Sequence, residues 1–587
     1  MEITSLFAPI AQSALFALIG YVAYLVLIPI LFPVRRPPSK APWNGGNFSR
    51  DYARGTGKPI PCKNPATGEY LGEAKAYTPV EVKSAHARAA RAAEEWSKTT
   101  FTERRALLMD IHDWILDNQE LIAQKSCKET GKTLAEASLG EVMTTLEKLR
   151  WLVAHGEPCL TPEYRGVPLL LWFTKSARVE WYPMGVIGII VPWNYPFHNV
   201  MSHVATALFA GNGAVVKVSE WASSSAEWIE DVLRECLAKR GHNPDLVQIL
   251  TGYGETGAAL VKSGVDKILF IGSPQVGKLV MKGASENLTP VILELGGKDA
   301  FVVCDDADLD HCIDIAIRGA FINCGQNCIS AERFLVQDGI YDEFLSRVLA
   351  KLKQTAQGAS CEGKRCDFGA MTMPGQAAHV DALVKDAVSK GAKLLAGGKR
   401  VGKEGDHPTY YEPTILANID LKMKIATEET FGPVMTVIRW KSEDELEKLT
   451  NSTPYGLGSS IFSRNYTKAE RISKRIVTGM ANINDFAIVP LIQSLPFGGV
   501  RDSGFGAFNG EEGLRGFSRR KAITTDRFGI RAAAPDWLQY PISSNAKTIV
   551  QHAMFMVYGR SILESAKGCM NMLKAVASAP PKPEKKD

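Results

Sequence analysis

Cys328 is the residue of this sequence best placed to act as a nucleophile. It ends the segment PheIleAsnCysGlyGlnAsnCys (321–328), where its nearest neighbours are small and polar. A thiol buried only for packing usually has apolar neighbours, although most of the eleven cysteines should be structural. Cys324 leaves open a metal clip or a disulfide, but no further His or Cys cluster lies nearby. The surroundings of Cys328 therefore favour a reactive thiol.

Two further side chains could assist this nucleophile. Glu294 lies in the apolar segment ProValIleLeuGluLeuGlyGlyLysAsp (290–299). Burial raises the pKa of a carboxyl group and makes it a plausible general base, the alternative being a buried ion pair with a lysine. Asn194, in ProTrpAsnTyrPro (192–196), could donate its amide N–H to an oxyanion, as could the backbone N–H of Cys328. The alternative for Asn194 is a plain turn residue.

A glycine motif and a serine offer contacts for phosphate groups. The motif GxGxxG at 252–257, which includes Gly254, follows an expected strand at 247–250. The acidic residue that should hold a ribose about 20 residues later is missing. Gly272 and Ser273 open the next expected helix, where backbone N–H groups and a hydroxyl suit a pyrophosphate, although Ser273 could be a simple N-cap. A nucleotide would not be held in the usual dinucleotide-fold way.

Lys217 and Glu220 stand at the end of an expected buried strand, where open α/β sheets bind ligands. A carboxylate can accept hydrogen bonds from both hydroxyls of a ribose, and a lysine can donate to the same group. The alternative is a solvated charge pair.

The spacing of apolar residues predicts an α/β fold. Short runs that are apolar on both faces alternate with segments of helix length, which is typical of a parallel sheet covered by helices. Right-handed crossovers wind such repeats into a doubly wound, dinucleotide-binding type of architecture. The expected strands are 185–191, 214–218, 247–250, 267–271, 291–295 and 300–303.

Helical spacing precedes this sheet, and a second α/β unit follows it from about Gly319. The expected helices are Val82 to Trp96, one capped by Thr102 and reaching Ile115, one that stops at Gly131, one from about Leu134, and those at 341–353 and 376–390. Strands are expected at 433–439 and 459–463. Residues 544–587 predict an amphipathic helix, which would either dock on the body or lie on a membrane, and a disordered tail.

Composition and charge exclude several classes. With 587 residues, 45% hydrophobic and 22% charged, the chain resembles a soluble globular protein with two or more folded units. A net charge of +5 gives no reason to expect nucleic-acid binding. The odd number of scattered cysteines fits a reducing compartment.

The N-terminus departs from this average. Residues 10–33 are almost wholly apolar, and a helix of that length rises roughly 36 Å, enough to cross a ~30 Å hydrocarbon layer. A cleaved signal peptide would carry positive charge before a shorter run, whereas Arg35, Arg36 and Lys40 follow this one. We expect a single-pass anchor in residues 1–40 with the catalytic domain in the cytosol. The endoplasmic reticulum is the expected membrane, because a mitochondrial presequence is absent.

Together these segments resemble one superfamily, the NAD(P)-dependent aldehyde dehydrogenases. The resemblance spans about residues 45 to 525. It rests on eight blocks in the family's order, at 64–69, 192–196, 210–220, 270–278, 293–298, 321–328, 428–434 and 496–506.

The resemblance implies a role for each matching residue. Cys328 would be the nucleophile, Glu294 the general base and Asn194 the oxyanion amide. The residues expected to bind NAD, with NADP possible, are Trp193, Lys217, Glu220, Gly254, Gly272, Ser273, Glu429 and Phe431. Glu220 favours NAD because its carboxylate repels a 2′-phosphate. No metal site is expected.

The implied fold is aldehyde dehydrogenase-like, with two doubly wound α/β domains, a β-hairpin oligomerisation arm and the N-terminal transmembrane helix. The expected domains are 1–40 (anchor and basic flank), 41–296 (cofactor binding, with an arm segment near 165–182), 297–500 (catalytic), 501–543 (arm and return segment, with an arm strand near 516–525) and 544–587 (C-terminal helix and tail). The implied partners are a small-molecule aldehyde substrate, membrane lipid through the N-terminal helix, and further copies in a homodimer or homotetramer.

Some features fall outside the family pattern. Val218 replaces the family's usual proline, and 358–370 differs enough to leave its loop geometry open. The N-terminal anchor is most similar to a membrane-anchored subgroup known from fungi and plants. Two rival functions remain open, namely a catalytically silent membrane-tethered scaffold and a fatty-aldehyde-specific enzyme. Acyl transfer to coenzyme A ranks below hydrolysis, because Glu294 can activate water.

Overall fold

The computed structural model describes residues 54–363, 365–401, 408–529 and 534–578. The chain divides into two compact units. The larger contains the described residues up to Leu160 together with 182–519, and the smaller contains 161–181 and the described residues after 519. The predicted anchor in residues 1–40 lies outside the described ranges and stays a prediction. Within those ranges, no helix has the length and apolar content needed to span a bilayer.

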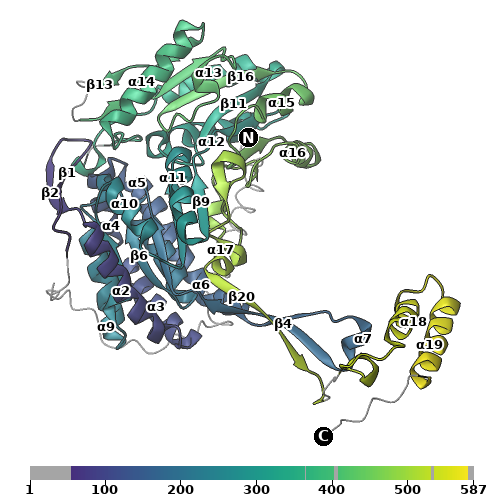
Figure 1. Ribbon diagram of the computed structural model, residues 1–587. Helices are drawn as coiled ribbons and strands as arrows, with labels where there is room; N and C mark the ends of the chain where they lie inside the picture. Colours follow the sequence, from purple (N-terminus) through teal and green to yellow (C-terminus); the bar gives the residue numbers. More distant parts are fainter. Residues whose placement is uncertain (1–53, 364, 402–407, 530–533, 579–587) are drawn as a thin grey trace, which may run out of the picture. The chain divides into compact units, whose positions relative to one another are not determined.

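A six-stranded mixed sheet organises the first part of the larger unit (Figure 1). Its order is β19-β9-β8-β5-β6-β7; β5 to β9 run parallel, and the short β19 is antiparallel to β9. Every residue of β5, β6 and β7 is buried, as expected for strands covered by helices on both faces. The bounds are β5 Val186–Ile190, β6 Gly213–Lys217, β7 Val247–Leu250, β8 Lys267–Gly272, β9 Val291–Leu295 and β19 Gly504–Phe505.

A seven-stranded sheet organises the rest, in the order β12-β15-β16-β11-β10-β17-β18. All its pairings are parallel except that of β12 with β15. The segment 300–303, predicted for the first sheet, lies in β10 of this one, and the second unit therefore begins before Gly319. An apolar run reveals a strand but not its sheet. The bounds are β10 Asp299–Val303, β11 Ala331–Gln337, β12 Lys393–Ala396, β15 Thr414–Ala417, β16 Val434–Trp440, β17 Ser459–Phe462 and β18 Asn482–Ile483.

Helices of the larger unit pack on these sheets. The helix predicted from a Thr102 cap begins instead after Thr100, because Thr100 and Glu103 have the capping-box spacing and hydrogen-bond reciprocally. Gly131 ends the following helix with a left-handed φ of 81°, as its position predicts. The bounds are α2 Pro79–Trp96, α3 Phe101–Asp117, α4 Gln119–Thr130, α5 Leu134–Ala137, α6 Thr144–Leu160, α8 Pro196–Phe209, α9 Ala226–Lys239, α10 Gly254–Lys262, α11 Pro274–Ala284, α12 Leu309–Phe321, α13 Tyr341–Leu352, α14 Pro374–Ser389, α15 Glu443–Thr450, α16 Tyr466–Ser473 and α17 Gly510–Gly516.

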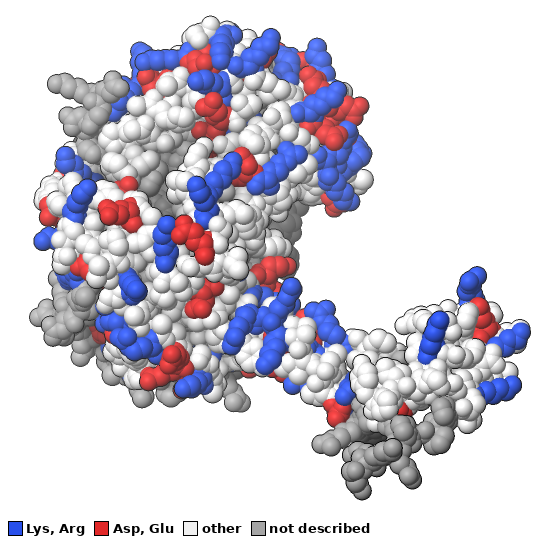
Figure 2. Space-filling model, in the orientation of Figure 1, with Lys and Arg blue, Asp and Glu red and all other residues white. Residues whose placement is uncertain are grey.

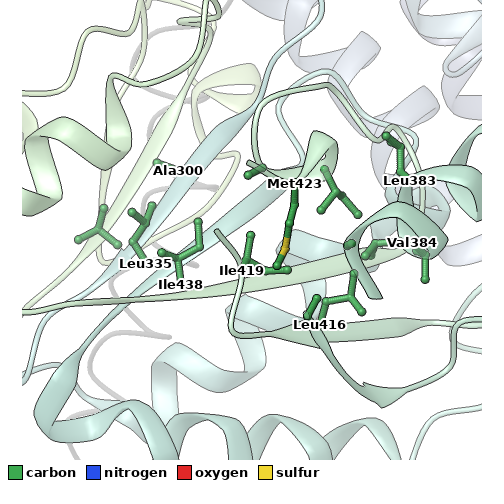
Figure 3. Packing of buried hydrophobic residues seen from close by; sticks show 14 of the residues in the cluster. Ala300, Leu335, Leu383, Val384, Leu416, Ile419, Met423 and Ile438 are labelled. Carbon is green, nitrogen blue, oxygen red and sulfur yellow. The ribbon is translucent and has the colours of Figure 1, made fainter. Parts of the chain in front are cut away.

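The core on one face of the second sheet joins its strands to α14 (Figure 3). Leu335 of β11 and Ile438 of β16 are buried in one apolar cluster with Leu383 and Val384 of α14. Burying a side chain of this size contributes about 1.5–3 kcal/mol. This packing fixes β11, the strand that follows Cys328 in the chain.

The smaller unit contains the predicted arm segments. Strand β4 (Lys175–Pro183) runs from it into the larger unit and lies between β20 (Ser518–Asp526) and β3 (Glu163–Arg165) in a three-stranded sheet. These bounds overlap the two expected segments, and the oligomerisation role stays a prediction. The single C-terminal helix predicted from residue 544 is instead two, α18 (Ala546–Tyr558) and α19 (Ile562–Ala577), because Gly559 and the Ser561 N-cap interrupt it.

Candidate active site

One cavity of about 640 Å³ in the larger unit brings together most of the predicted site residues. Glu294, the fourth residue of β9, and the loops after β5 and β8 reach it from the carboxyl ends of parallel strands, where open α/β sheets bind ligands. Cys328 reaches it from the second sheet, just before β11. The predicted site residues in its lining are Asn194, Trp193, Gly272, Ser273, Glu294, Cys328, Glu429 and Phe431.

Cys328 follows a loop with unusual backbone geometry. Asn323, Cys324 and Gly325 all have left-handed φ angles, between 51° and 70°. Because non-glycine residues avoid this region, contacts must hold the loop in place. The buried Gln326 supplies them, since its side-chain amide donates to the carbonyl of Asn323 at 2.9 Å and its Oε1 accepts the backbone N–H of Thr372 at 2.9 Å. The loop leaves Cys328 only half-buried, beside the cavity.

Glu294 is almost fully buried, and Oε1 of its carboxyl has no hydrogen-bond partner among the described residues. Burial raises the pKa of Glu294 to about 8, a hydrogen bond with the Cys328 thiol opposes this, and Asp299 adds to it. Burial, followed by the charge of Glu294, also raises the pKa of Cys328 well above its usual value. The two groups are therefore in contact, and the carboxylate form of Glu294 can accept the thiol proton.

Asn194 is held by hydrogen bonds to both its side chain and its backbone. Its Nδ2 donates to the carbonyl of Gln326 at 3.3 Å, and its Oδ1 accepts from Asn199 at 3.4 Å. Its backbone carbonyl accepts from the buried Lys132 Nζ at 2.7 Å, and Lys132 is paired with the buried Glu141 at 2.6 Å. The Asn194 amide lines the same cavity as Cys328. If the Cys328 sulfur bonds to a carbonyl carbon, this amide can donate to the oxyanion that forms from the carbonyl oxygen.

Glu429 and Phe431 approach the site from the loop before β16. Glu429 accepts a hydrogen bond from the backbone N–H of Gly297 at 2.9 Å, and burial raises the pKa of Glu429 to about 8. A side chain at Gly296 would collide with the Glu429 carboxylate, so the glycine permits this close approach. Phe431 meets Trp193 edge to face, with ring centroids 5.6 Å apart.

Comparison with known proteins identifies the family of this chain. The model of the aldehyde dehydrogenase family matches residues 52–523. The chain belongs to the aldehyde dehydrogenase family. An aldehyde dehydrogenase-like protein of Schizosaccharomyces pombe is 40% identical over 85% of this chain and 96% of its own length.

Solved structures of nicotinamide-dependent enzymes share the fold. An NAD-dependent aldehyde dehydrogenase from Sinorhizobium meliloti superposes with a TM-score of 0.76 at 32% identity, covering 82% of this chain and 94% of that one. An NADP-dependent enzyme of E. coli superposes with a TM-score of 0.76 at 29% identity, covering 82% of this chain and 97% of that one. These neighbours agree with the expected cofactor class, NAD or NADP.

Three predicted cofactor contacts of this aldehyde dehydrogenase lie outside the cavity lining. Lys217 ends β6, and its Nζ lies 3.7 Å from the Glu220 carboxylate. Gly254 begins α10, and a Cβ added there would meet no atom within 4 Å. Lys217 and Gly254 therefore lie at the ends of the neighbouring strands β6 and β7. The open space at Gly254 gives a phosphate access to the backbone N–H groups at the start of α10. Ser273 caps α11 by accepting from Val276, yet its O–H can still donate.

Buried ion pairs that no sequence pattern predicted position the candidate site of this dehydrogenase. Lys298 Nζ donates to Glu332 at 2.5 Å and to Thr430 Oγ1 at 2.8 Å. Glu332 accepts the backbone N–H groups of Thr430 and Phe431, and so holds the loop that carries Glu429. A carboxylate in an apolar strand was the signal used for Glu294, and Glu332 in β11 carries the same signal.

Two findings concern the remaining cysteines. Cys324 and Cys328 are both free, so no disulfide joins them, and among the described residues no group of three or more His, Cys, Asp or Glu side chains could hold a metal ion. Cys127 of α4 and Cys361, in the unusual 358–370 stretch, are joined by a disulfide that no pattern in the sequence indicated. They lie 234 residues apart, so their proximity depends on the fold.

Proposed function

We propose that this chain oxidises an apolar aldehyde to the carboxylic acid with NAD while anchored to a membrane by its N-terminal segment. The observation that carries the catalytic part is the convergence of Cys328, Glu294 and Asn194 on one cavity. A thiol, a base in contact with it and a fixed amide donor are the groups needed for covalent oxidation of a carbonyl.

The cofactor fits the groups at the sheet edge. Lys217 and Glu220 would hold the adenosine ribose, the N-terminus of α10 and the Ser273 hydroxyl a pyrophosphate, and Glu429 the second ribose. Glu220 supports NAD over NADP, because its carboxylate would repel a 2′-phosphate. When bound, NAD supplies the hydride acceptor that the oxidation requires.

The residues themselves perform the remaining steps. Glu294 accepts the thiol proton of Cys328, and the thiolate sulfur attacks the aldehyde carbon to give a thiohemiacetal. Asn194 and the backbone N–H of Cys328 hold its oxyanion. Glu294 then releases this first proton to solvent. After oxidation to the thioester, Glu294 takes a proton from water, whose oxygen attacks the acyl carbon, and it returns that proton to the departing Cys328 thiolate. The carbon–sulfur bond breaks and releases the acid.

The cavity wall supports an apolar substrate. Apolar side chains dominate the part of the wall not contributed by the predicted cofactor contacts, namely Leu139, Met143, Ile322, Phe486, Ile488, Leu491, Phe497 and Phe508. Polar side chains also line the cavity, among them Thr144, His198, Asn199, Asn327 and Asn509 and the charged Arg318 and Asp485. Each methylene buried there should contribute about 0.8 kcal/mol to transition-state binding.

A homologous series tests both the activity and the substrate class. In NADH formation by the full chain, kcat/KM should rise about fourfold per methylene from butanal to octanal, and hexadecanal should be preferred over glyceraldehyde. A preference for glyceraldehyde would contradict the apolar substrate class. A folded protein that binds NAD yet turns over no aldehyde would instead favour a tethered scaffold.

The membrane part of the proposal rests on the sequence of residues 10–33. Full-length protein in membranes should resist extraction by alkaline carbonate. Val22→Arg combined with Leu25→Arg should release it, because each arginine at the centre of a span costs about 3 kcal/mol. Complete extraction of the unmodified chain would rule out the anchor and leave the catalytic proposal untouched.

A further inference from the structure

We propose that α18 and α19 form a second membrane contact, a helical hairpin that lies on the surface of a bilayer containing anionic phospholipids. No residue of either helix lines the catalytic cavity. Four observations within the smaller unit carry the proposal: how the helices pair, what they leave exposed, their charge, and their length.

The two helices pair through small residues. Gly568 of α19 is buried, and a Cβ there would collide with the backbone of Phe555 and Met556 in α18. The helices therefore approach backbone to backbone at this point. Ala546 and Ile549 are the buried side chains of α18. Such an interface buries few large side chains and so gains little from the hydrophobic effect.

The large apolar side chains point outward instead. Ile562 is 92% exposed and Leu563 66% exposed. A water-soluble helical pair would turn such residues inward, because an amphipathic helix buries its apolar stripe. Exposed apolar side chains in such number on two short helices mark an interaction site. The other exposed apolar residues of the hairpin are Val550, Met554, Phe555, Val557, Tyr558, Met570, Leu573 and Val576.

The charge of the hairpin selects the partner. The segment 545–578 has a net charge of +3 with His552 neutral. Its only acidic residue is Glu564, and its basic residues are Lys547, Arg560, Lys567 and Lys574. The Glu564 carboxylate accepts the backbone N–H of Arg560 at the start of α19. On the face visible in Figure 2 the hairpin is mostly white, with separate blue side chains and a little red. Apolar side chains among cations suit acyl chains beneath anionic headgroups.

A second copy of the chain fits less well. A symmetric contact would place identical surfaces against each other and bring two +3 hairpins together. The helix lengths favour lying on the bilayer rather than crossing it. With 13 and 16 residues, α18 and α19 are roughly 20 and 24 Å long, shorter than a ~30 Å hydrocarbon core.

Photo-crosslinking in the full chain tests the proposal. A benzophenone amino acid replaces Phe555 on the hairpin or, as control, Tyr466 on α16, another exposed aromatic residue. Each protein is reconstituted with vesicles of phosphatidylcholine and phosphatidylserine, and the aldehyde dehydrogenase activity of each confirms its folding. We expect lipid adducts at position 555 well above those at 466, and few in phosphatidylcholine alone.

Charge reversal separates docking from mere proximity to a membrane. Lys567→Glu combined with Lys574→Glu should reduce lipid adducts at 555 by about tenfold or more, because each basic residue contributes to binding an anionic surface. Lys282→Glu combined with Lys422→Glu, two exposed lysines of the larger unit, makes the same change in net charge and should have little effect. Adducts between chains, adducts with the larger unit, or equal labelling at 555 and 466 would overturn the proposal.

Discussion

Cys328→Ala is expected to lower kcat for aldehyde oxidation by at least about 10⁴-fold, because it removes the atom that forms the covalent bond to the substrate. The substitution removes only the sulfur atom of a half-buried side chain, so folding should persist. NAD binding should also persist, because the predicted ribose and phosphate contacts belong to other residues. Stopped-flow NADH absorbance should then show neither a burst nor steady turnover.

Cys324→Ala is the matched control. Cys324 lies in the same loop and is buried, but it does not line the cavity. Its replacement should keep kcat within a few-fold of the unmodified enzyme, with a small loss of stability from the lost packing. Equal activity in Cys328→Ala and the unmodified enzyme would refute the assignment of the nucleophile.

Glu294→Gln is expected to lower steady-state kcat by about 10²–10⁴-fold through slow hydrolysis of the thioester. The replacement is isosteric and removes a carboxyl group that is costly to ionise where it lies, so the fold should tolerate it. If the remaining activity suffices to form the thioester, NADH should appear as a burst of one equivalent per site and then stop. Mass spectrometry of the quenched protein should find the acyl group on Cys328.

The pH dependence provides an independent check on Glu294. Its pKa is raised to about 8, so the carboxylate, which is the basic form, becomes more populated as the pH rises through that value. The ionised fraction is about one tenth at pH 7 and about nine tenths at pH 9, so kcat should rise roughly tenfold over this range. Glu294→Gln should lose that rise, and an unchanged profile in the variant would assign the titration to another group.

The site was predictable where local chemistry is unusual. Cys328 stands among polar neighbours, and Glu294 interrupts an apolar strand; both anomalies are visible without coordinates. Such anomalies do not show which residue each of these side chains contacts in the fold. The contact of Glu294 with Cys328, and of Lys132 with the Asn194 carbonyl, join residues far apart in the chain.

The errors in the predicted fold have the same origin. Apolar spacing recognised 300–303 as a strand but grouped it with the first sheet, because spacing carries no information about neighbours. The domain bounds implied by the family resemblance, 297–500, had separated it from that sheet. The Thr102 cap was wrong because two threonines compete, and only Thr100 has a glutamate three residues later. The C-terminal segment was predicted as one helix because its apolar periodicity continues through it. Gly559, a local indication of a helix end, separates α18 from α19.

By itself the sequence determined the α/β class, the family and the groups that carry the chemistry, because strand and helix periods, glycines and reactive side chains are local properties. The tertiary structure alone decided which strands share a sheet, which buried lysine meets which glutamate, and that Cys127 meets Cys361. It also decided that the large apolar residues of α18 and α19 face outward. Each of these depends on which segments the folded chain brings together, and pairwise burial and electrostatics act only after they meet.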